Sequence, residues 1–239
     1  MTEVESNRQP ILGHLSELRN RLIKGSIAVV VGAFASFFYR QEMLDFLQQP
    51  YLDVTGGQEL VVTGPTEPFS IAMRIALFGG VLLASPVLFY QAWAFVNPAL
   101  TKRERKWAFP IVAALVSLFG LGVAFAYWSL ERALDFLLNI QPGLGILITV
   151  EFYVRFVIRF LLVFGIAFQF PVFLFGTAAA GVVTSAQLAA GRRWAVLIIV
   201  TVGAIVTPTG DPLTLLLLSA PLYLFYEVTI WLVRWILRK

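Results

Sequence analysis

Long uncharged apolar segments dominate the chain, and charged residues or turns separate them. A helix needs about 20 apolar residues to cross roughly 30 Å of hydrocarbon. The pattern predicts six transmembrane helices, at residues 22–39, 68–96, 107–130, 152–180, 194–206 and 213–233. We therefore expect an all-α integral membrane protein in which residues 1–239 form a single six-helix transmembrane domain.

The fifth and sixth predicted helices are short or interrupted. At 1.5 Å rise per residue, segment 194–206 reaches only ~20 Å, which is less than the thickness of the bilayer core. Pro221 is expected to kink the sixth helix, and Pro86 the second, because proline removes a backbone hydrogen bond. Either the bilayer thins beside the short helices or neighbouring protein buries their ends; the pairing of the two at one edge favours thinning.

The first predicted helix could instead be a cleaved signal peptide, since Ala33 and Ala35 have the spacing of a cleavage site. Signal peptides begin with a short basic region, whereas this tail is long and contains Glu3, Glu5 and Glu17. We expect the helix to be retained.

The distribution of Lys and Arg predicts the orientation. If the N-terminus is inside, the inner segments hold 13 of the 18 basic residues. The positive-inside rule then places both termini in the cytoplasm. The outer segments, 40–67 and 131–151, are rich in apolar residues, and we expect them to fold as a cap over a concave face.

Composition agrees with a membrane protein and excludes several kinds of site. Hydrophobic residues make up 59% of the chain and charged residues 13%, against about 25% charged in soluble domains. The absence of Cys excludes disulfides and thiolate chemistry, and the single His excludes a histidine metal cluster. We expect no cofactor and no metal. The net charge of +4 reflects topology, so no nucleic-acid partner is expected.

Polar residues lie at membrane depth in the fourth predicted helix and just before it. Glu151 and Gln169 are 18 positions, or five helical turns, apart, and Arg155 and Arg159 fall near the same stripe. Ionisable residues cost at least ~2.5 kcal/mol each at this depth, so the stripe is expected to face a partly hydrated surface. Alternatively, Glu151 and Arg155 form a local ion pair and Arg159 extends to the interface. Gln169 is too deep for that and is the stronger functional candidate.

Three more polar residues lie within or next to other predicted transmembrane helices. Arg74 lies near the outer end of the second predicted helix, and Gln91 lies further inward on the same helix. Asp211, in the outer turn before the sixth helix, is at the level of Arg74 or Arg155. It is a candidate ion-pair partner for either, and the sequence does not choose between them.

Two acidic residues stand out among the cations of the inner side. Glu17 can pair with Arg21 one helical turn later, and Glu104 is flanked by arginines. Exposed pairs of this kind contribute at most about 1 kcal/mol and need no function. The alternative is that the two carboxylates bind a cationic peptide, ideally through a bidentate guanidinium.

Several motifs, in order along nearly the whole chain, resemble the TatC family, the multispanning core of the twin-arginine protein translocase. They are HLSELRNRL at 14–22, SPVLFYQAWAFVNPAL at 85–100, KRER at 102–105, FGIAFQFP at 164–171, and the Thr207-Pro208 turn with Asp211.

The resemblance implies a receptor, not an enzyme, in the cytoplasmic (inner) membrane. It binds the Arg-Arg motif of signal peptides on folded cargo and works with small single-span TatA and TatB partners, using the proton-motive force. Self-association of such a core subunit is also an expectation. In the family, the acids that match Glu17 and Glu104 are implicated in recognition, and Phe95 matches an important aromatic position. Arg19 shares the motif of Glu17 and is grouped with these binding residues.

The position of Gln169 is often Glu in the family. An amide does not ionise near neutral pH, so Gln169 departs from the family in any role that requires a titrating carboxylate, whereas it can still form a hydrogen bond to a partner.

A secondary transporter is the alternative function, with Arg74, Arg155, Arg159 and Gln169 as a substrate site. Transporters often contain internal repeats. The sequence shows no repeat, and these arginines cluster toward the outer side. An intramembrane protease is excluded by the position of His14 and by the lack of two deep aspartates.

Overall fold

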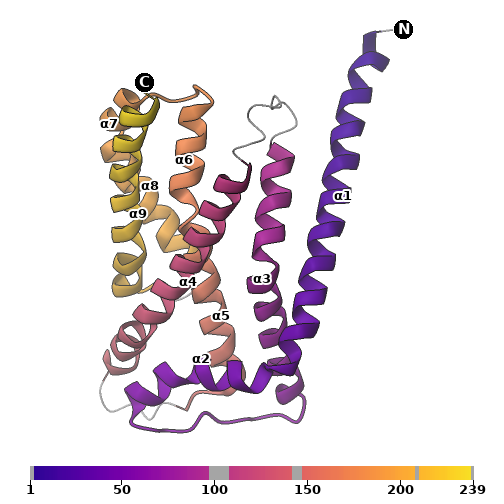
Figure 1. Ribbon diagram of the computed structural model, residues 1–239. Coiled ribbons are helices and arrows are strands. Elements are labelled where there is room, and N and C mark those ends of the chain that lie inside the picture. The colour runs from indigo at the N-terminus through magenta and orange to yellow at the C-terminus, as the bar shows by residue number, and fades with distance from the viewer. Residues whose placement is uncertain (1–2, 97–107, 142–146, 208–209, 238–239) are drawn as a thin grey trace. The chain divides into compact units, whose positions relative to one another are not determined.

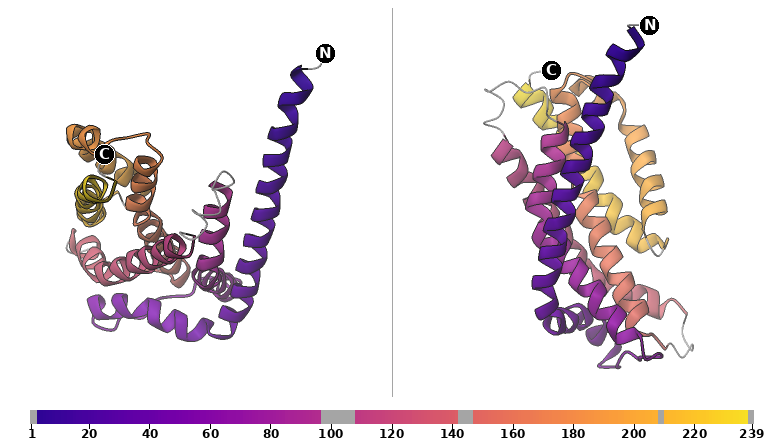
Figure 2. Two further views of the ribbon diagram at one scale, coloured as in Figure 1. Left: turned by 45° about the horizontal axis from the view of Figure 1, so that its top comes forward. Right: turned by 90° about the vertical axis from the view of Figure 1, so that its right-hand side faces the viewer.

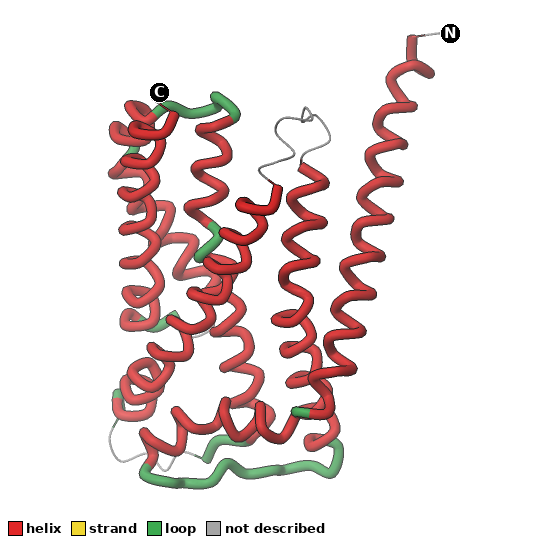
Figure 3. The backbone as a smooth tube through the Cα atoms, in the orientation of Figure 1, coloured by secondary structure: helices red, strands yellow, loops and turns green. Residues whose placement is uncertain are grey.

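The computed structural model describes residues 3–96, 108–141, 147–207 and 210–237. In this part of the chain the secondary structure is helical, apart from an isolated bridge between Val61 and Thr149 (Figures 1 and 3). The helices are α1 (Glu3–Phe38), α2 (Arg40–Thr55), α3 (Glu67–Val96), α4 (Ala108–Asn139), α5 (Val150–Ala167), α6 (Phe170–Ala179), α7 (Ser185–Ala190), α8 (Arg192–Val206), α9 (Pro212–Leu232) and the π-helix Val233–Leu237.

Five helical stretches in the described residues are long and apolar enough to cross a membrane. They are Leu15–Phe38, Glu67–Phe95, Phe109–Asn139, Val150–Ala179 and Pro212–Ile236. The prediction of an all-α membrane protein is confirmed. The count of six is not, because α8 has only 15 residues and reaches about 22 Å. Whether α8 also spans, and the single-domain organisation of residues 1–239, stay predictions.

The structure divides the fourth predicted helix, 152–180, into α5 and α6. Pro171 lies in the first turn of α6 and has no N–H to donate to the carbonyl of Ala167. The backbone hydrogen-bond ladder of α5 therefore stops at this point. The backbone N–H of Gln169 donates instead to the Ile166 carbonyl at 2.9 Å. Gln169 consequently lies at the junction between two helices rather than inside one.

The described residues cluster into two compact units, which we treat separately: Met1–Leu44 with Pro68–Val116, and Asp45–Glu67 with Ser117–Lys239. In the first unit, α1 and α3 touch through their backbones. A Cβ atom built on Gly80 would lie 2.6 Å from the Ala33 nitrogen and 2.7 Å from the Val29 oxygen. One on Gly32 would lie 2.8 Å from the Gly80 oxygen. Small residues permit such close helix crossings in membranes. From this crossing the two helices diverge toward the N-terminus of α1 (Figures 1 and 2).

In the second unit, hydrogen bonds hold the segment 45–67 against α4 and α5. The Tyr153 hydroxyl donates to the Leu47 carbonyl at 2.7 Å, and the Tyr127 hydroxyl to the Phe46 carbonyl at 2.8 Å. The amide of Val150 donates to the Val61 carbonyl at 3.0 Å, next to the isolated bridge. These bonds satisfy carbonyls of α2 and of the following segment. A cap over a concave face stays a prediction.

The short helix α8 packs against α9 in the second unit. A bidentate ion pair joins them: Arg192 Nε lies 2.7 Å from Glu227 Oε1, and Nη2 lies 2.9 Å from Oε2. The Tyr226 hydroxyl of α9 also donates to the carbonyl of Leu188 in α7, the helix just before α8, at 2.6 Å. The ion pair therefore ties the N-terminus of α8 to α9, and the tyrosine bond ties α9 to α7.

Candidate functional site

The predicted inner-side residues on α1 and α3 form one polar cluster. Glu17 Oε1 accepts hydrogen bonds from Arg21 Nε at 2.9 Å and from Arg21 Nη2 at 2.5 Å. Arg21 Nη1 makes a longer contact of 3.4 Å with Gln91 Oε1 on α3. We call these three residues the Glu17–Arg21–Gln91 cluster. Glu104 lies outside the described residues.

The cluster lies at a groove between α1 and α3 with a volume of about 570 Å³. The groove exists because the helices diverge from their glycine crossing. Its lining includes Leu18, Arg21 and Leu22 from α1, and Leu88, Gln91 and Phe95 from α3. Phe95 and Gln91 therefore line one groove together with Arg21. Glu17 does not line this groove, but the guanidinium of Arg21 connects it to the groove.

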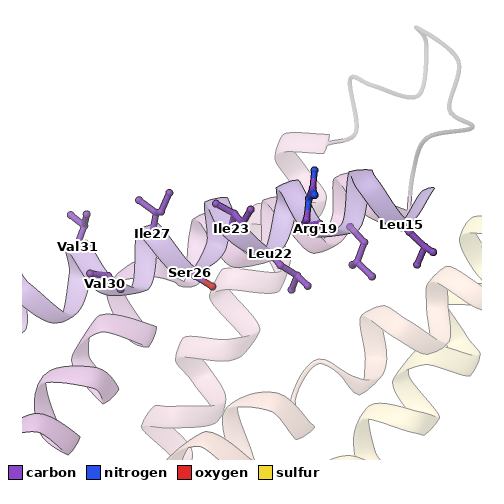
Figure 4. Close-up of a pocket in the computed structure, with 9 residues that line it drawn as sticks. Leu15, Arg19, Leu22, Ile23, Ser26, Ile27, Val30 and Val31 are labelled. Carbon is purple, nitrogen blue, oxygen red and sulfur yellow. The ribbon is translucent and has the colours of Figure 1, made fainter. Parts of the chain in front are cut away.

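Arg19 faces a different side of α1. A second hollow of about 530 Å³ runs along α1 and is lined by Arg19, Ile23, Ile27 and Val31, among other residues. Figure 4 shows these four side chains on one side of the helix and Leu22 on the other. Arg19 is two positions from both Glu17 and Arg21, which is about 200° around a helix. Arg19 is exposed and does not line the groove between α1 and α3.

On α5, Glu151 and Arg155 form the local ion pair that the sequence predicts as one alternative. Arg155 Nη2 donates to Glu151 Oε1 one turn earlier, and both side chains are partly exposed. Arg159 is exposed. The structure thus shows the local ion pair of Glu151 with Arg155, and the polar stripe that includes Gln169 stays a prediction.

Gln169 satisfies only part of its hydrogen-bonding capacity. Its Nε2 donates to the Gly165 carbonyl at 3.2 Å. Its Oε1 is buried and has no hydrogen-bond partner among the described residues. A buried acceptor without a donor costs about 1–3 kcal/mol, so this atom favours the approach of another donor.

Asp211 acts as the N-cap of α9. Its Oδ1 accepts a hydrogen bond from the Thr214 amide at 2.7 Å, and the side chain is buried. A capping carboxylate also interacts favourably with the positive end of the helix dipole. The role that the structure shows for Asp211 is therefore that of a helix cap, and its ion pair with Arg74 or Arg155 stays a prediction.

Two features of the site have weak sequence signals. The close crossing needs Gly32 and Gly80, and the spacing of Gly25 from Gly32 by seven residues indicates a glycine face on α1. The contact between Arg21 and Gln91 joins positions 70 residues apart, which no periodicity within one helix reveals. The described residues contain no group of three His, Cys, Asp or Glu side chains that could hold a metal ion.

Comparisons with known proteins agree on one family. The family model for "Sec-independent protein translocase protein (TatC)" matches residues 13–221. The TatC protein of Aquifex aeolicus is 38% identical over 238 residues, which cover 96% of this chain and 97% of that protein. The solved structure described as "Crystal Structure of Twin Arginine Translocase Receptor- TatC" has a TM-score of 0.76 and 38% identity, and covers 92% of this chain and 98% of the other. A second crystal structure of that receptor, in DDM, has a TM-score of 0.80 and 38% identity over 92% of this chain and 99% of the other.

Proposed function

Because the chain belongs to the TatC family of Sec-independent protein translocase proteins, we propose that it is the signal-peptide receptor of a twin-arginine translocase. As a family member it is a multi-pass membrane subunit of a protein translocase rather than an enzyme. The proposal adds what it binds, which is the arginine pair in the signal peptides of folded cargo proteins. This assignment replaces the alternative of a secondary transporter.

The Glu17 carboxylate beside the α1–α3 groove is the observation that carries the receptor function. A carboxylate offers two oxygens in the geometry that a guanidinium fork matches. Next to it, Leu18, Leu22, Leu88 and Phe95 provide an apolar lining for side chains that flank the arginine pair. Solved relatives 38% identical are described as twin-arginine translocase receptors. Glu104 and Arg19 are proposed to complete the site.

The proposed topology has six spans in the cytoplasmic membrane with both termini inside. Five candidate spans are long enough, and α8 is proposed as the short sixth, beside a locally thinned bilayer. The 13 of 18 basic residues in the inner segments support this orientation. Segments 40–67 and 131–151 are proposed as the outer cap, with Arg74, Arg155 and Arg159 on the outer side. Kinks at Pro86 and Pro221 remain part of the proposal.

We infer that small single-span TatA- and TatB-type proteins are the partners, and that the proton-motive force drives transport without a nucleotide. The buried Oε1 of Gln169 supports a partner contact, because a polar side chain on a neighbouring transmembrane helix is a suitable donor. Self-association of the subunit is included in the proposal.

The proposed transport predicts a specific requirement for cargo. Membrane vesicles that contain the chain and its single-span partners are expected to transport a folded fluorescent cargo whose signal peptide contains Arg-Arg. Transport is expected to stop when a protonophore collapses the gradient or when both arginines become lysines. The amount of cargo that becomes protected from added protease measures the transport. Equal transport of the Arg-Arg and Lys-Lys cargoes would reject the proposed selectivity.

A further inference from the structure

We propose that Arg21 is an internal competitor for the Glu17 carboxylate: its guanidinium occupies the carboxylate in the free protein, and the guanidinium of an incoming signal peptide displaces it. This inference rests on the proposed receptor function and adds a step to it. The peptide exchanges one arginine for another at Glu17, and does not fill an empty site.

The geometry of the pair leaves room for exchange. Arg21 directs both Nε and Nη2 to the same oxygen, Glu17 Oε1. In the described part of the chain no donor reaches the other oxygen, Oε2. The side chains of Arg21 and Glu17 are 24% and 32% exposed, so solvent and a ligand can approach them. A guanidinium can thus contact Oε2 before Arg21 leaves Oε1, and the carboxylate is never left without a donor.

The Arg192–Glu227 pair of the same protein is more fully bonded than the Glu17–Arg21 pair. Arg192 engages both oxygens of Glu227, and the Tyr223 hydroxyl donates a third bond at 3.1 Å. That arrangement is the bidentate fork, the strongest form of the interaction. The Glu17–Arg21 pair lacks this fork, because both nitrogens of Arg21 contact the same oxygen of Glu17. An incoming guanidinium on a separate chain is not tied to α1 and can use both oxygens.

Gln91 provides a place for Arg21 after displacement. Arg21 Nη1 already lies 3.4 Å from Gln91 Oε1, and both residues line the α1–α3 groove. A carboxamide is a neutral acceptor, so it holds a guanidinium more weakly than a carboxylate does. Gln91 therefore retains Arg21 beside the groove without competing with Glu17 for it. The consequence is that Arg21 lowers the affinity for the peptide by the strength of its own pair with Glu17.

A set of variants tests the competition through the affinity for an Arg-Arg signal peptide. In the purified full chain, Arg21→Gln is expected to tighten binding about two- to fivefold, which matches the usual strength of such pairs. Lys24→Gln removes an equal charge from an exposed position on α1 and is expected to have a smaller effect. In a Glu17→Gln background, the effect of Arg21→Gln is expected to fall to that of Lys24→Gln. Weaker binding by Arg21→Gln, or a gain no larger than that of Lys24→Gln, would overturn the proposal.

A spectroscopic measurement reports on Arg21 directly. The Nε–H resonance of Arg21, labelled with ¹⁵N-arginine and assigned by its loss in Arg21→Gln, is expected to shift on addition of the Arg-Arg peptide. The new position is expected to resemble that in Glu17→Gln. A resonance that is identical in wild type and Glu17→Gln would refute the internal pair.

The outcomes separate this inference from the receptor function. One outcome is that wild type prefers Arg-Arg over Lys-Lys peptides while Arg21→Gln gives no gain in affinity and the Arg21 resonance does not shift. In that case the receptor function stands and the role of Arg21 as a competitor is refuted. If neither wild type nor Arg21→Gln binds the Arg-Arg peptide, the receptor function fails and the displacement fails with it.

Discussion

Replacing Gly80 by leucine is expected to destabilise the unit formed by α1 and α3 by about 3 kcal/mol or more. A Cβ atom at this position would lie 2.6 Å from the backbone nitrogen of Ala33 and 2.8 Å from its Cα. Backbone atoms do not move aside as a flexible side chain does, so the two helices must separate. Because the groove begins at this crossing, the separation is expected to disturb the Glu17–Arg21–Gln91 cluster as well.

The measurement is thermal unfolding in detergent, with a smaller substitution and a matched glycine for comparison. Gly80→Ala adds only the Cβ and is expected to cost about 1–3 kcal/mol. Gly120→Ala on α4 is the control, since a Cβ there meets no atom within 4 Å. It is expected to be neutral or to stabilise by up to ~1 kcal/mol, because alanine favours helix more than glycine. Equal unfolding temperatures for Gly80→Ala and Gly120→Ala would contradict the close crossing.

Replacing Glu17 by glutamine is expected to weaken binding of an Arg-Arg signal peptide about 10- to 100-fold. The amide has nearly the shape of the carboxylate but no charge, and a hydrogen bond to a charged partner contributes about 1.5–3 kcal/mol. Every 1.4 kcal/mol changes the dissociation constant tenfold. Titration of a labelled peptide into the purified protein measures the change.

The matched control for Glu17→Gln is Glu131→Gln, which removes the same charge from an exposed position on α4. It is expected to leave the affinity unchanged, and the thermal stability of both variants is expected to remain close to that of wild type. A similar loss of affinity in both variants would mean that overall charge, rather than the α1 site, attracts the peptide.

The apolar segments were sufficient to predict most of the helices, whereas the helix ends needed other signals. Residues 3–21 are helical in the structure, but charged residues interrupt the apolar ones in this segment, so the apolar run alone places the start of the helix at residue 22. The division of the fourth helix was readable from Pro171, which cannot donate to a carbonyl one turn earlier. The cap role of Asp211 was also readable, because an Asp followed by Pro is a typical helix start.

The candidate site could be predicted only where its contacts are local. The pairs of Glu17 with Arg21 and of Glu151 with Arg155 follow from the i,i+4 spacing. The contact of Arg21 with Gln91 depends on how α1 crosses α3, which in turn depends on glycines in both helices. Such a contact is a property of tertiary packing, and hydrophobic periodicity within one helix does not contain it.

The most direct test of the receptor function compares two peptides on one protein. A signal peptide that contains Arg-Arg and its Lys-Lys counterpart carry the same charge, but only arginine presents a planar fork to a carboxylate. Their dissociation constants for the purified full chain in detergent are expected to differ at least tenfold, in favour of Arg-Arg. Equal affinities would contradict the account, because attraction by charge alone does not distinguish the two peptides.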